Sequence, residues 1–249
     1  MALSDEELER YARHIVLREV GGVGQNRLKA ANIAVVGAGG IGSAAIPALA
    51  GAGVGRLTIV DDDVVEIANL HRQPLFTEAD SGKPKAERAA AFVQRLNRFV
   101  EVRPVRARID RDNAGQLLSE HDLVFDGSDN FATRLAVSDA CVALGIPLVS
   151  AAAVQFQAQV GLFRAQPCYR CFVGDAFDAD DCDNCAELGV LGALPATAGS
   201  FAALLAINTV VGIGGTQAGK VHLFDGEKLE WRAIEIPPDR SCKACGVNR

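Results

Sequence analysis

The first half of this chain alternates between two hydrophobic patterns. Short runs of apolar, often β-branched residues indicate buried strands at 33–36, 57–60 and 123–125. Between these runs, helix-compatible segments lie at 43–50 and from about Pro84, a residue that suits a first helical turn. Strands that alternate with helices are typical of a parallel sheet covered by helices.

The pattern changes after Pro147. Further strand-like runs follow at 148–154, 157–164, 221–225 and 229–236. The last two are joined by the short link Gly226-Glu227-Lys228, a length typical of antiparallel hairpins. We therefore predict an α/β fold. Its Rossmann-like nucleotide-binding first half is parallel and continues into antiparallel strands of one mixed sheet.

We interpret residues 1–249 as a single domain with three parts. These parts are an N-terminal helical segment (1–26), a Rossmann-like half (27–150) and an antiparallel half (151–249) that contains a crossover loop at about 175–190. The glycine-rich segment 21–24 is expected to break the N-terminal helical segment. A strand at 100–109 is expected at a sheet edge, because Pro104 cannot donate a ladder hydrogen bond.

Charge and composition narrow the function classes. The net charge of −6 does not favour nucleic acid as a partner. The first residues are charged and lack an apolar signal core, so we expect a cytoplasmic protein. Residues 188–219 carry no charge and are long enough for a membrane span. Pro195 and Asn208 lie within them and no Lys/Arg cluster flanks them, so we expect a core helix and no membrane association.

A glycine-rich turn between the first two predicted strands carries the strongest chemical signal. Gly37, Gly39 and Gly42 fit the pattern G-x-G-x-x-G, directly after a strand and at the start of a helix. The first glycine permits a tight turn, the second lets a phosphate approach the backbone, and the third lets the helix pack on the strand. The helix start offers free N–H groups to an anion. Asp61 ends the second strand, where a carboxylate can bind ribose hydroxyls, so we predict a nucleotide site.

Two further charged residues lie where a ligand could bind. Asp129 follows the strand at 123–125, and ligands of open α/β sheets bind at the carboxyl ends of parallel strands. It is a candidate metal or ligand residue, with helix capping as the alternative. Lys85 lies in the first turn of a predicted helix, where its charge opposes the helix dipole, so it needs an anion or solvent beside it.

The seven cysteines suggest metal or thiol chemistry. Two CxxC pairs could together provide four thiolates for tetrahedral Zn²⁺: Cys168, Cys171, Cys242 and Cys245. The fold would have to unite the two pairs, and the zinc would then pin the C-terminus to the sheet. A third pair, Cys182 and Cys185, lies in an acidic stretch and lacks the context of a thioredoxin-type motif. Cys141 lies in an apolar helical segment and is expected in the core.

In combination these motifs resemble the ThiF/MoeB/HesA family, the bacterial relatives of ubiquitin-activating enzymes, over nearly the whole chain. The resemblance rests on Arg10-Tyr11-Ala12-Arg13, Gly37-Ala38-Gly39-Gly40-Ile41-Gly42, Asp61-Asp62-Asp63-Val64-Val65, Asn69-Leu70-His71-Arg72-Gln73, Lys83-Pro84-Lys85, Asp126-Gly127-Ser128-Asp129-Asn130 and the two outer CxxC pairs. His14 stands where the family usually has Gln.

The resemblance implies an enzyme that makes an acyl adenylate. ATP and Mg²⁺ would activate the C-terminal glycine carboxylate of a small ubiquitin-like sulfur-carrier protein ending in Gly-Gly, and pyrophosphate would leave. A sulfur donor such as a cysteine desulfurase would then convert the adenylate to a thiocarboxylate. The attacking carboxylate is already ionised at pH 7, so the reaction needs cations around the triphosphate rather than a general base. The carrier and its pathway stay open between molybdopterin, thiamin and another thiolated product.

The resemblance also implies a set of nucleotide-binding residues: Gly37, Gly39, Gly40, Gly42, Asp61, Asp63, Asn69, Arg72, Gln73, Lys85 and Asp129. In this set Asp61 would hold the ribose. Arg72 and Lys85 would act on the phosphates, and Asp129 would bind Mg²⁺.

Two further catalytic positions follow from the resemblance. Arg13 would reach the phosphates from the neighbouring subunit of a homodimer. Cys185 matches the cysteine that forms a covalent link to the carrier in some members and is dispensable in others. Cys182, three residues earlier, could trap Cys185 as a disulfide or act as its resolving thiol.

Three other functions remain as alternatives. An NAD-dependent oxidoreductase would explain the glycine loop and Asp61, but not the segment 69–73, Lys85 or the CxxC pairs. A catalytically silent, zinc-stapled scaffold could bind a nucleotide or a protein partner. A tRNA-modifying dehydratase could adenylate a small carboxylate, although the double CxxC argues against it.

Overall fold

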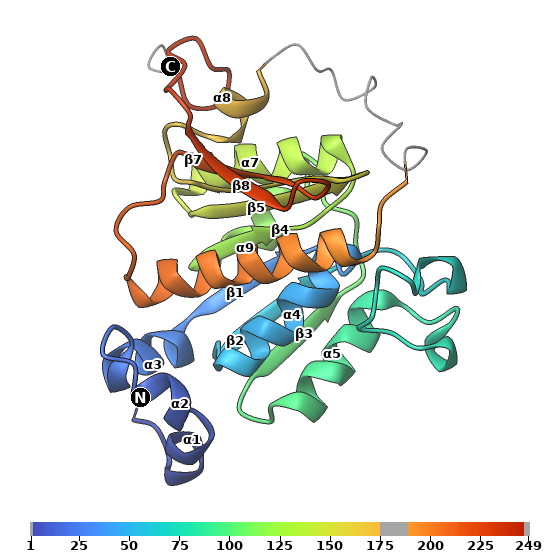
Figure 1. The fold of residues 1–249 in the computed structure, drawn as a ribbon, viewed down its shortest axis with the longest axis vertical. Coiled ribbons are helices and arrows are strands. Elements are labelled where there is room, and N and C mark those ends of the chain that lie inside the picture. The colour runs from blue at the N-terminus through green and yellow to red at the C-terminus, as the bar shows by residue number, and fades with distance from the viewer. Residues whose placement is uncertain (1, 175–188, 247–249) are drawn as a thin grey trace.

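The computed structural model describes residues 2–174 and 189–246. Within these residues the strands form one eight-stranded sheet in the order β3-β2-β1-β4-β5-β6-β7-β8 (Figure 1). The strands are β1 (Asn32–Val36), β2 (Arg56–Val60), β3 (Glu101–Val105), β4 (Leu123–Asp126), β5 (Leu148–Val154), β6 (Gln157–Phe163), β7 (Lys220–Asp225) and β8 (Glu230–Glu235). The pairings among β1 to β5 are parallel, and those from β5 to β8 are antiparallel. The predicted mixed sheet is confirmed.

Helices cover both faces of the sheet. They are α1 (Asp5–Arg10), α2 (Ala12–Ile15), α3 (Gly21–Ala30), α4 (Gly40–Ala52), α5 (Lys85–Leu96), α6 (Ala114–Leu118), α7 (Phe131–Leu144), α8 (Tyr169–Val173) and α9 (Ala193–Val211), with 3-10 turns η1 (Ile67–Asn69) and η2 (Glu78–Asp80). One core lies between the sheet and α4, α5 and α9, and a second lies between the sheet and α6, α7 and α8. Strand β1 serves both, because Ile33 and Val35 face the first core and Ala34 and Val36 face the second.

The prediction that the segment 21–24 breaks the helical segment is wrong, because Gly21 begins α3. Gly21 has a positive φ of 55° and makes the turn into this helix. Gly24 lies inside the helix and is buried. A Cβ atom at Gly24 would lie 2.8 Å from Val211 Cγ1, so this glycine lets α3 approach the end of α9 closely. Its role is packing rather than chain breaking.

Strand β3 lies at one edge of the sheet, as Pro104 predicts. It ends at Val105 rather than at residue 109. Its only strand partner within the described residues, β2, ends at Val60, which is in register with Val105. The chain therefore turns away from the sheet where the ladder partner stops.

The uncharged stretch forms α9, which lies across one face of the sheet (Figure 1). Among the described residues it is the one helix long and apolar enough to span a membrane, a property that core helices of globular proteins share. Half of its most apolar window is buried, against α4, α3 and strands β5 and β6. These contacts account for its apolar composition and support the prediction of a core helix.

Candidate functional site

The carboxyl ends of β1, β2 and β4 lie next to one another. We call this end of the sheet, together with the loops that follow these strands, the nucleotide edge. Gly37, directly after β1, donates from its N–H to the Val60 carbonyl of β2 at 2.9 Å, and Gly127 donates to Val36 at 2.9 Å. Gly37 has a φ of 89°, and a Cβ atom there would lie 3.0 Å from the Gly127 carbonyl oxygen. The backbone is too crowded for a side chain, as the fingerprint predicts.

The remaining glycines of the loop differ in what surrounds them. A Cβ atom at Gly42 would lie 2.2 Å from the Gly37 carbonyl oxygen, so this residue allows the helix to pack on the strand. One at Gly40 would meet Pro195 of α9 at 3.1 Å, which makes Gly40 a packing position as well. For a Cβ atom at Gly39 the nearest atom of the described residues, apart from the adjoining residues, would be Gln73 Nε2 at 3.7 Å. Space therefore remains above the second glycine, where the fingerprint expects a phosphate.

Asp61 connects the glycine loop to the segment that follows β2. Its Oδ2 accepts a hydrogen bond from Ala38 N at 2.7 Å, and its Oδ1 accepts one from Asp63 N at 2.9 Å. Burial raises the pKa of Asp61, and these two hydrogen bonds offset only part of that effect. Asp61 thus shapes the loop in the free protein, and its predicted contact with ribose stays a prediction.

Lys85 is buried and pairs with Asp63, whose Oδ2 lies 2.9 Å from its Nζ. The Lys85 N–H also donates to the Asp63 carbonyl at 3.0 Å. The anion that a lysine at a helix start requires is therefore supplied by this carboxylate. Helix α5 begins at Lys85, and Pro84 is its N-cap residue rather than its first residue.

The segment 69–73 packs over the glycine loop. The Asn69 carbonyl accepts hydrogen bonds from Arg72 N and Gln73 N, both at 3.1 Å. Gln73 is 4% exposed, and its Oε1 has no hydrogen-bond partner among the described residues. Arg72 is half-buried, with its Nη1 3.5 Å from His71 Nε2. A buried amide oxygen without a donor, beside an uncrowded glycine, fits a bound ligand at this position.

The loop after β4 settles which residue caps α7. Asn130 Oδ1 accepts a hydrogen bond from Thr133 N at 2.9 Å, so Asn130 is the N-cap. The capping alternative for Asp129 is therefore wrong. Asp129 is exposed and lies three residues after the end of β4, in a loop whose Gly127 and Ser128 lie against Gly37 of the glycine loop.

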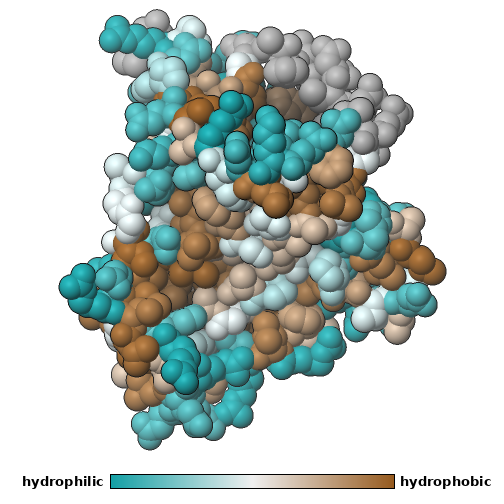
Figure 2. Space-filling model, in the orientation of Figure 1, coloured by the Kyte–Doolittle hydropathy of each residue, from teal (hydrophilic) through white to brown (hydrophobic). Residues whose placement is uncertain are grey.

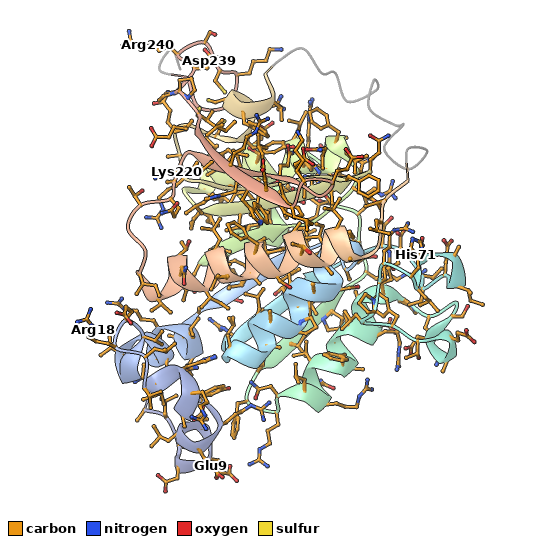
Figure 3. The ribbon with its side chains drawn as sticks, in the orientation of Figure 1. Glu9, Arg18, His71, Lys220, Asp239 and Arg240 are labelled. Carbon is orange, nitrogen blue, oxygen red and sulfur yellow. The ribbon has the colours of Figure 1, made fainter. Side chains whose placement is uncertain are left out.

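Arg13 lies away from all these residues. It belongs to α2, and the neighbouring Tyr11 packs on Gly53 at the C-terminal end of α4. The glycine loop lies at the opposite end of α4, a helix of 13 residues and so about 20 Å long. In Figure 3 the labelled residues of the N-terminal region, Glu9 and Arg18, lie at the bottom and on the left, whereas His71 lies on the right-hand side. The single chain does not bring Arg13 to the nucleotide edge.

The two outer CxxC pairs meet, as predicted. Sγ of Cys168 lies 3.6 Å from that of Cys242, Cys171 and Cys245 are 3.4 Å apart, and all four sulfurs lie within 4.8 Å of one another. Tetrahedral zinc with bonds of about 2.3 Å to sulfur would need separations of about 3.8 Å. Burial raises the pKa of the Cys245 thiol to about 11, so four thiolates would require a bound cation. The donor set fits Zn²⁺.

The other cysteines are less informative for the site. Cys141 is 2% exposed within the second core, which confirms the prediction for it. Cys182, Cys185 and most of the predicted crossover loop lie outside the described residues.

Sequence reasoning missed Arg134, which is buried and donates a hydrogen bond to the Ser128 carbonyl in the loop that carries Asp129. Its signal was an arginine four residues after Asn130, within an otherwise mostly apolar helical stretch.

Comparison with known proteins relates this geometry to a family. Residues 11–245 match the ThiF family. The chain is 43% identical over 253 residues to the sulfur carrier protein adenylyltransferase of Thermus thermophilus, covering 99% of this chain and 93% of that protein. It is 42% identical over 247 residues to the SAMP-activating enzyme E1 of Haloferax volcanii, covering 99% and 92%. It is 38% identical to the molybdopterin-synthase adenylyltransferase of Escherichia coli, covering 98% of each.

Solved structures agree on the fold. The crystal structure of Escherichia coli MccB with ATP superimposes with a TM-score of 0.85 at 24% identity, over 98% of this chain and 75% of that one. At this identity the likeness concerns the fold alone. The sequence match extends over nearly the whole chain and includes the segments that form the nucleotide edge and the cysteine site. The chain therefore belongs to the ThiF family.

Proposed function

We propose that this protein adenylates the C-terminal glycine carboxylate of a small ubiquitin-like sulfur-carrier protein, using ATP and Mg²⁺. The observation that carries the proposal is the grouping, at one sheet edge, of a glycine loop with space beside Gly39, cationic side chains and an exposed carboxylate. Relatives that span nearly the whole chain are named as adenylyltransferases of sulfur carriers and of molybdopterin synthase. Their names support adenylation over an NAD-dependent oxidoreductase.

The glycine loop and the start of α4 would bind the triphosphate. Backbone N–H groups at a helix N-terminus and its positive dipole end favour an anion there. Gln73 Oε1 would accept a hydrogen bond from the nucleotide, which its buried and unpartnered state favours. Asp61 would accept hydrogen bonds from the ribose hydroxyls. Each of its carboxylate oxygens accepts one backbone N–H and has a lone pair left for this.

In this reaction the carrier's carboxylate attacks the α-phosphorus and pyrophosphate leaves. The nucleophile is ionised at neutral pH, so charge compensation is the main requirement. Arg72 and Lys85 would supply positive charge to the phosphates. Because Lys85 is paired with Asp63, its ammonium is held in position before the phosphates arrive. Asp129 would hold Mg²⁺, which lowers repulsion between the two anions.

We extend the proposal to a homodimer in which Arg13 completes the partner's site. Arg13 cannot reach the nucleotide edge of its own chain, because α4 separates the two. Three exposed apolar side chains follow Arg13 in sequence: Val16 and Leu17 between α2 and α3, and Val23 on α3. Figure 2 shows apolar surface gathered where these helices approach the end of α9. Mixing Arg13→Ala with Asp129→Ala protein should restore adenylation, and no recovery despite subunit exchange would contradict the shared site.

The four cysteines would bind one Zn²⁺ with a structural role, since four protein ligands leave no open position for a substrate. Conversion of the adenylate to a thiocarboxylate would need a sulfur donor such as a cysteine desulfurase. Cys185 would act in that later step, so Cys185→Ala should leave adenylation intact.

The test is ATP–pyrophosphate exchange with purified carriers ending in Gly-Gly. We expect exchange that depends on both the carrier and Mg²⁺, with the same carrier lacking its last glycine as a control. Exchange driven by a small carboxylate instead would favour a tRNA-modifying dehydratase. ATP binding without exchange would favour a silent scaffold, and either result would overturn the proposal.

A further inference from the structure

His14 is a polar residue of α2 that the proposed reaction does not use. It is half-buried, and its Nδ1 lies 3.2 Å from Oε1 of Gln25, which is fully buried on α3. The other end of the Gln25 amide is also bound, since its Nε2 donates to the Ala52 carbonyl at 2.8 Å. Gln25 Oε1 can only accept a hydrogen bond, so Nδ1 is the ring nitrogen of His14 that carries the proton and donates.

The Ala52 carbonyl belongs to the last turn of α4. Carbonyls in the last turn of a helix lack their usual helical partners, so side chains can bind them. Asn97, fully buried after α5, binds a second carbonyl there: its Nδ2 donates to Ala50 O at 2.7 Å and to the Tyr11 hydroxyl at 2.9 Å. The end of α4 is therefore joined twice to the chain around α2, through Tyr11 and through His14.

Arg13 lies between these two anchors. Helix α2 has only four residues, far fewer than an isolated helix needs to be stable in water, so its position depends on contacts with the rest of the protein. Tyr11 directly precedes α2, and His14 directly follows Arg13. The rings of Tyr11 and His14 stack at a centroid distance of 6.4 Å. The anchors thus fix the backbone that carries Arg13, while Arg13 itself is exposed.

We propose that His14 and Gln25 are positioning residues that hold Arg13 for the nucleotide edge of the partner subunit. The hydrogen bond between them fixes α2 on the end of α4, and with it the direction in which Arg13 leaves the surface. A glutamine, the residue that the family usually has at position 14, could donate from its own amide to the same oxygen. This inference rests on the proposed function, in which Arg13 completes the partner's site in a homodimer.

The test compares His14→Leu, which has no donor, with His14→Gln, which keeps one. In ATP–pyrophosphate exchange with the carrier, His14→Leu should be slower by about threefold to tenfold, the range for losing one hydrogen bond. His14→Ala also lacks a donor and cannot overfill the site, so it should show at least the same loss. His14→Gln should keep near-normal exchange. An equal loss in His14→Gln would show that the hydrogen bond is not the cause and would overturn the inference.

Asn26→Ala is the matched control on α3. Asn26 follows Gln25, is exposed, and donates from Nδ2 to the Gly22 carbonyl of the same helix at 2.9 Å. Its removal should leave exchange unchanged. A loss equal to that of His14→Leu would show that any disturbance of this helix slows the reaction, which would also overturn the inference.

Mixed dimers separate an effect on the partner's site from damage to the variant's own chain. In excess Asp129→Ala protein, each His14→Leu chain keeps its own Asp129 and receives Arg13 from a chain with intact His14. Exchange per His14→Leu chain should therefore rise to the wild-type rate per site. An excess of the double variant Arg13→Ala/Asp129→Ala should give no rise. No rise with Asp129→Ala, despite proven subunit exchange, would show that His14 acts within its own chain.

Removal of Arg13 gives a second check. In an Arg13→Ala background His14→Leu should have no further effect on exchange, whereas additive losses would show that His14 does not act through Arg13. Wild-type protein without carrier-dependent exchange would remove the proposed function as well. Normal exchange in His14→Leu, beside impaired exchange in Arg13→Ala, would remove this inference alone.

Discussion

The nucleotide edge and the four-cysteine site are assembled in opposite ways. The nucleotide edge takes its residues from short motifs that follow β1, β2 and β4, which pairing of parallel strands brings together. The cysteine site joins two pairs that are 74 residues apart in sequence, one in the first turn of α8 and one beyond the edge strand β8. Local changes should therefore disable the nucleotide edge and leave the fold intact. Changes at the cysteines should remove a long-range cross-link and lower stability.

The largest effect should come from breaking the cysteine site. Cys242→Ser removes one of the four ligands, so the protein should lose its metal and several kcal/mol of stability. The upper bound is the apparent binding free energy of structural zinc in zinc-finger peptides, about 10–16 kcal/mol. Thermal unfolding with and without a chelator measures this. Cys141→Ala changes a core cysteine outside the cluster, so the stability of this variant should still fall when the chelator is added. A wild type whose stability does not change when the chelator removes its metal would rule out a metal cross-link.

The next effect concerns chemistry at the nucleotide edge. Arg72→Ala and Asp129→Ala should each slow ATP–pyrophosphate exchange about 100-fold or more, the scale of losing one transition-state stabiliser. Their melting temperatures should stay close to that of the wild type. Arg108→Ala is the control, since it removes an exposed arginine that pairs with Asp62 beside the same edge. Near-normal exchange in both site variants would contradict the prediction that local changes at the nucleotide edge disable adenylation.

A smaller effect on stability is expected when a side chain is added within the glycine loop. In Gly42→Ala the new Cβ would lie 2.2 Å from the Gly37 carbonyl oxygen, so unfolding free energy should fall by about 1–3 kcal/mol. Gly51→Ala lies in the same helix, and beyond that helix's own backbone no atom of the described residues comes within 4 Å of the new Cβ, so the change should raise stability by about 0.5–1 kcal/mol. Chemical denaturation of both variants measures the difference. Equal effects would show that crowding at Gly42 does not matter.

The smallest effect is a dependence of stability on pH at the amino-terminal end of the sheet. His121 is buried, with Nδ1 3.1 Å from the Leu118 carbonyl and Nε2 2.9 Å from Thr58 Oγ1. Burial lowers its pKa, against the raising effects of the Leu118 carbonyl and of Glu120. Its stabilising contribution is therefore complete above the unfolded-state pKa of about 6.5 and is lost as pH falls through the folded-state pKa.

His121→Gln removes this titration. Between pH 7.5 and pH 5.5 the variant should lose less unfolding free energy than the wild type, as measured by urea denaturation at the two pH values. Equal losses would show that His121 does not contribute to the pH dependence.

The sequence determined the elements whose signal is local. The strands at 33–36, 57–60 and 123–125 were predictable because each is buried on both faces, which requires apolar residues throughout. The tight positions in the glycine loop were predictable because neighbouring backbone excludes a Cβ atom there. The change from parallel to antiparallel pairing followed from the short links between strands.

Only the tertiary structure decided which distant groups meet. Asp63 rather than solvent neutralises Lys85, and Asn130 rather than Asp129 caps α7. Gly24 lies inside a helix, where Val211 of α9, far away in sequence, packs against it. Such contacts depend on three-dimensional neighbours that no spacing rule contains. Burial makes these contacts important for stability, because a charge or polar group that is removed from water and left without a partner inside the fold is destabilising.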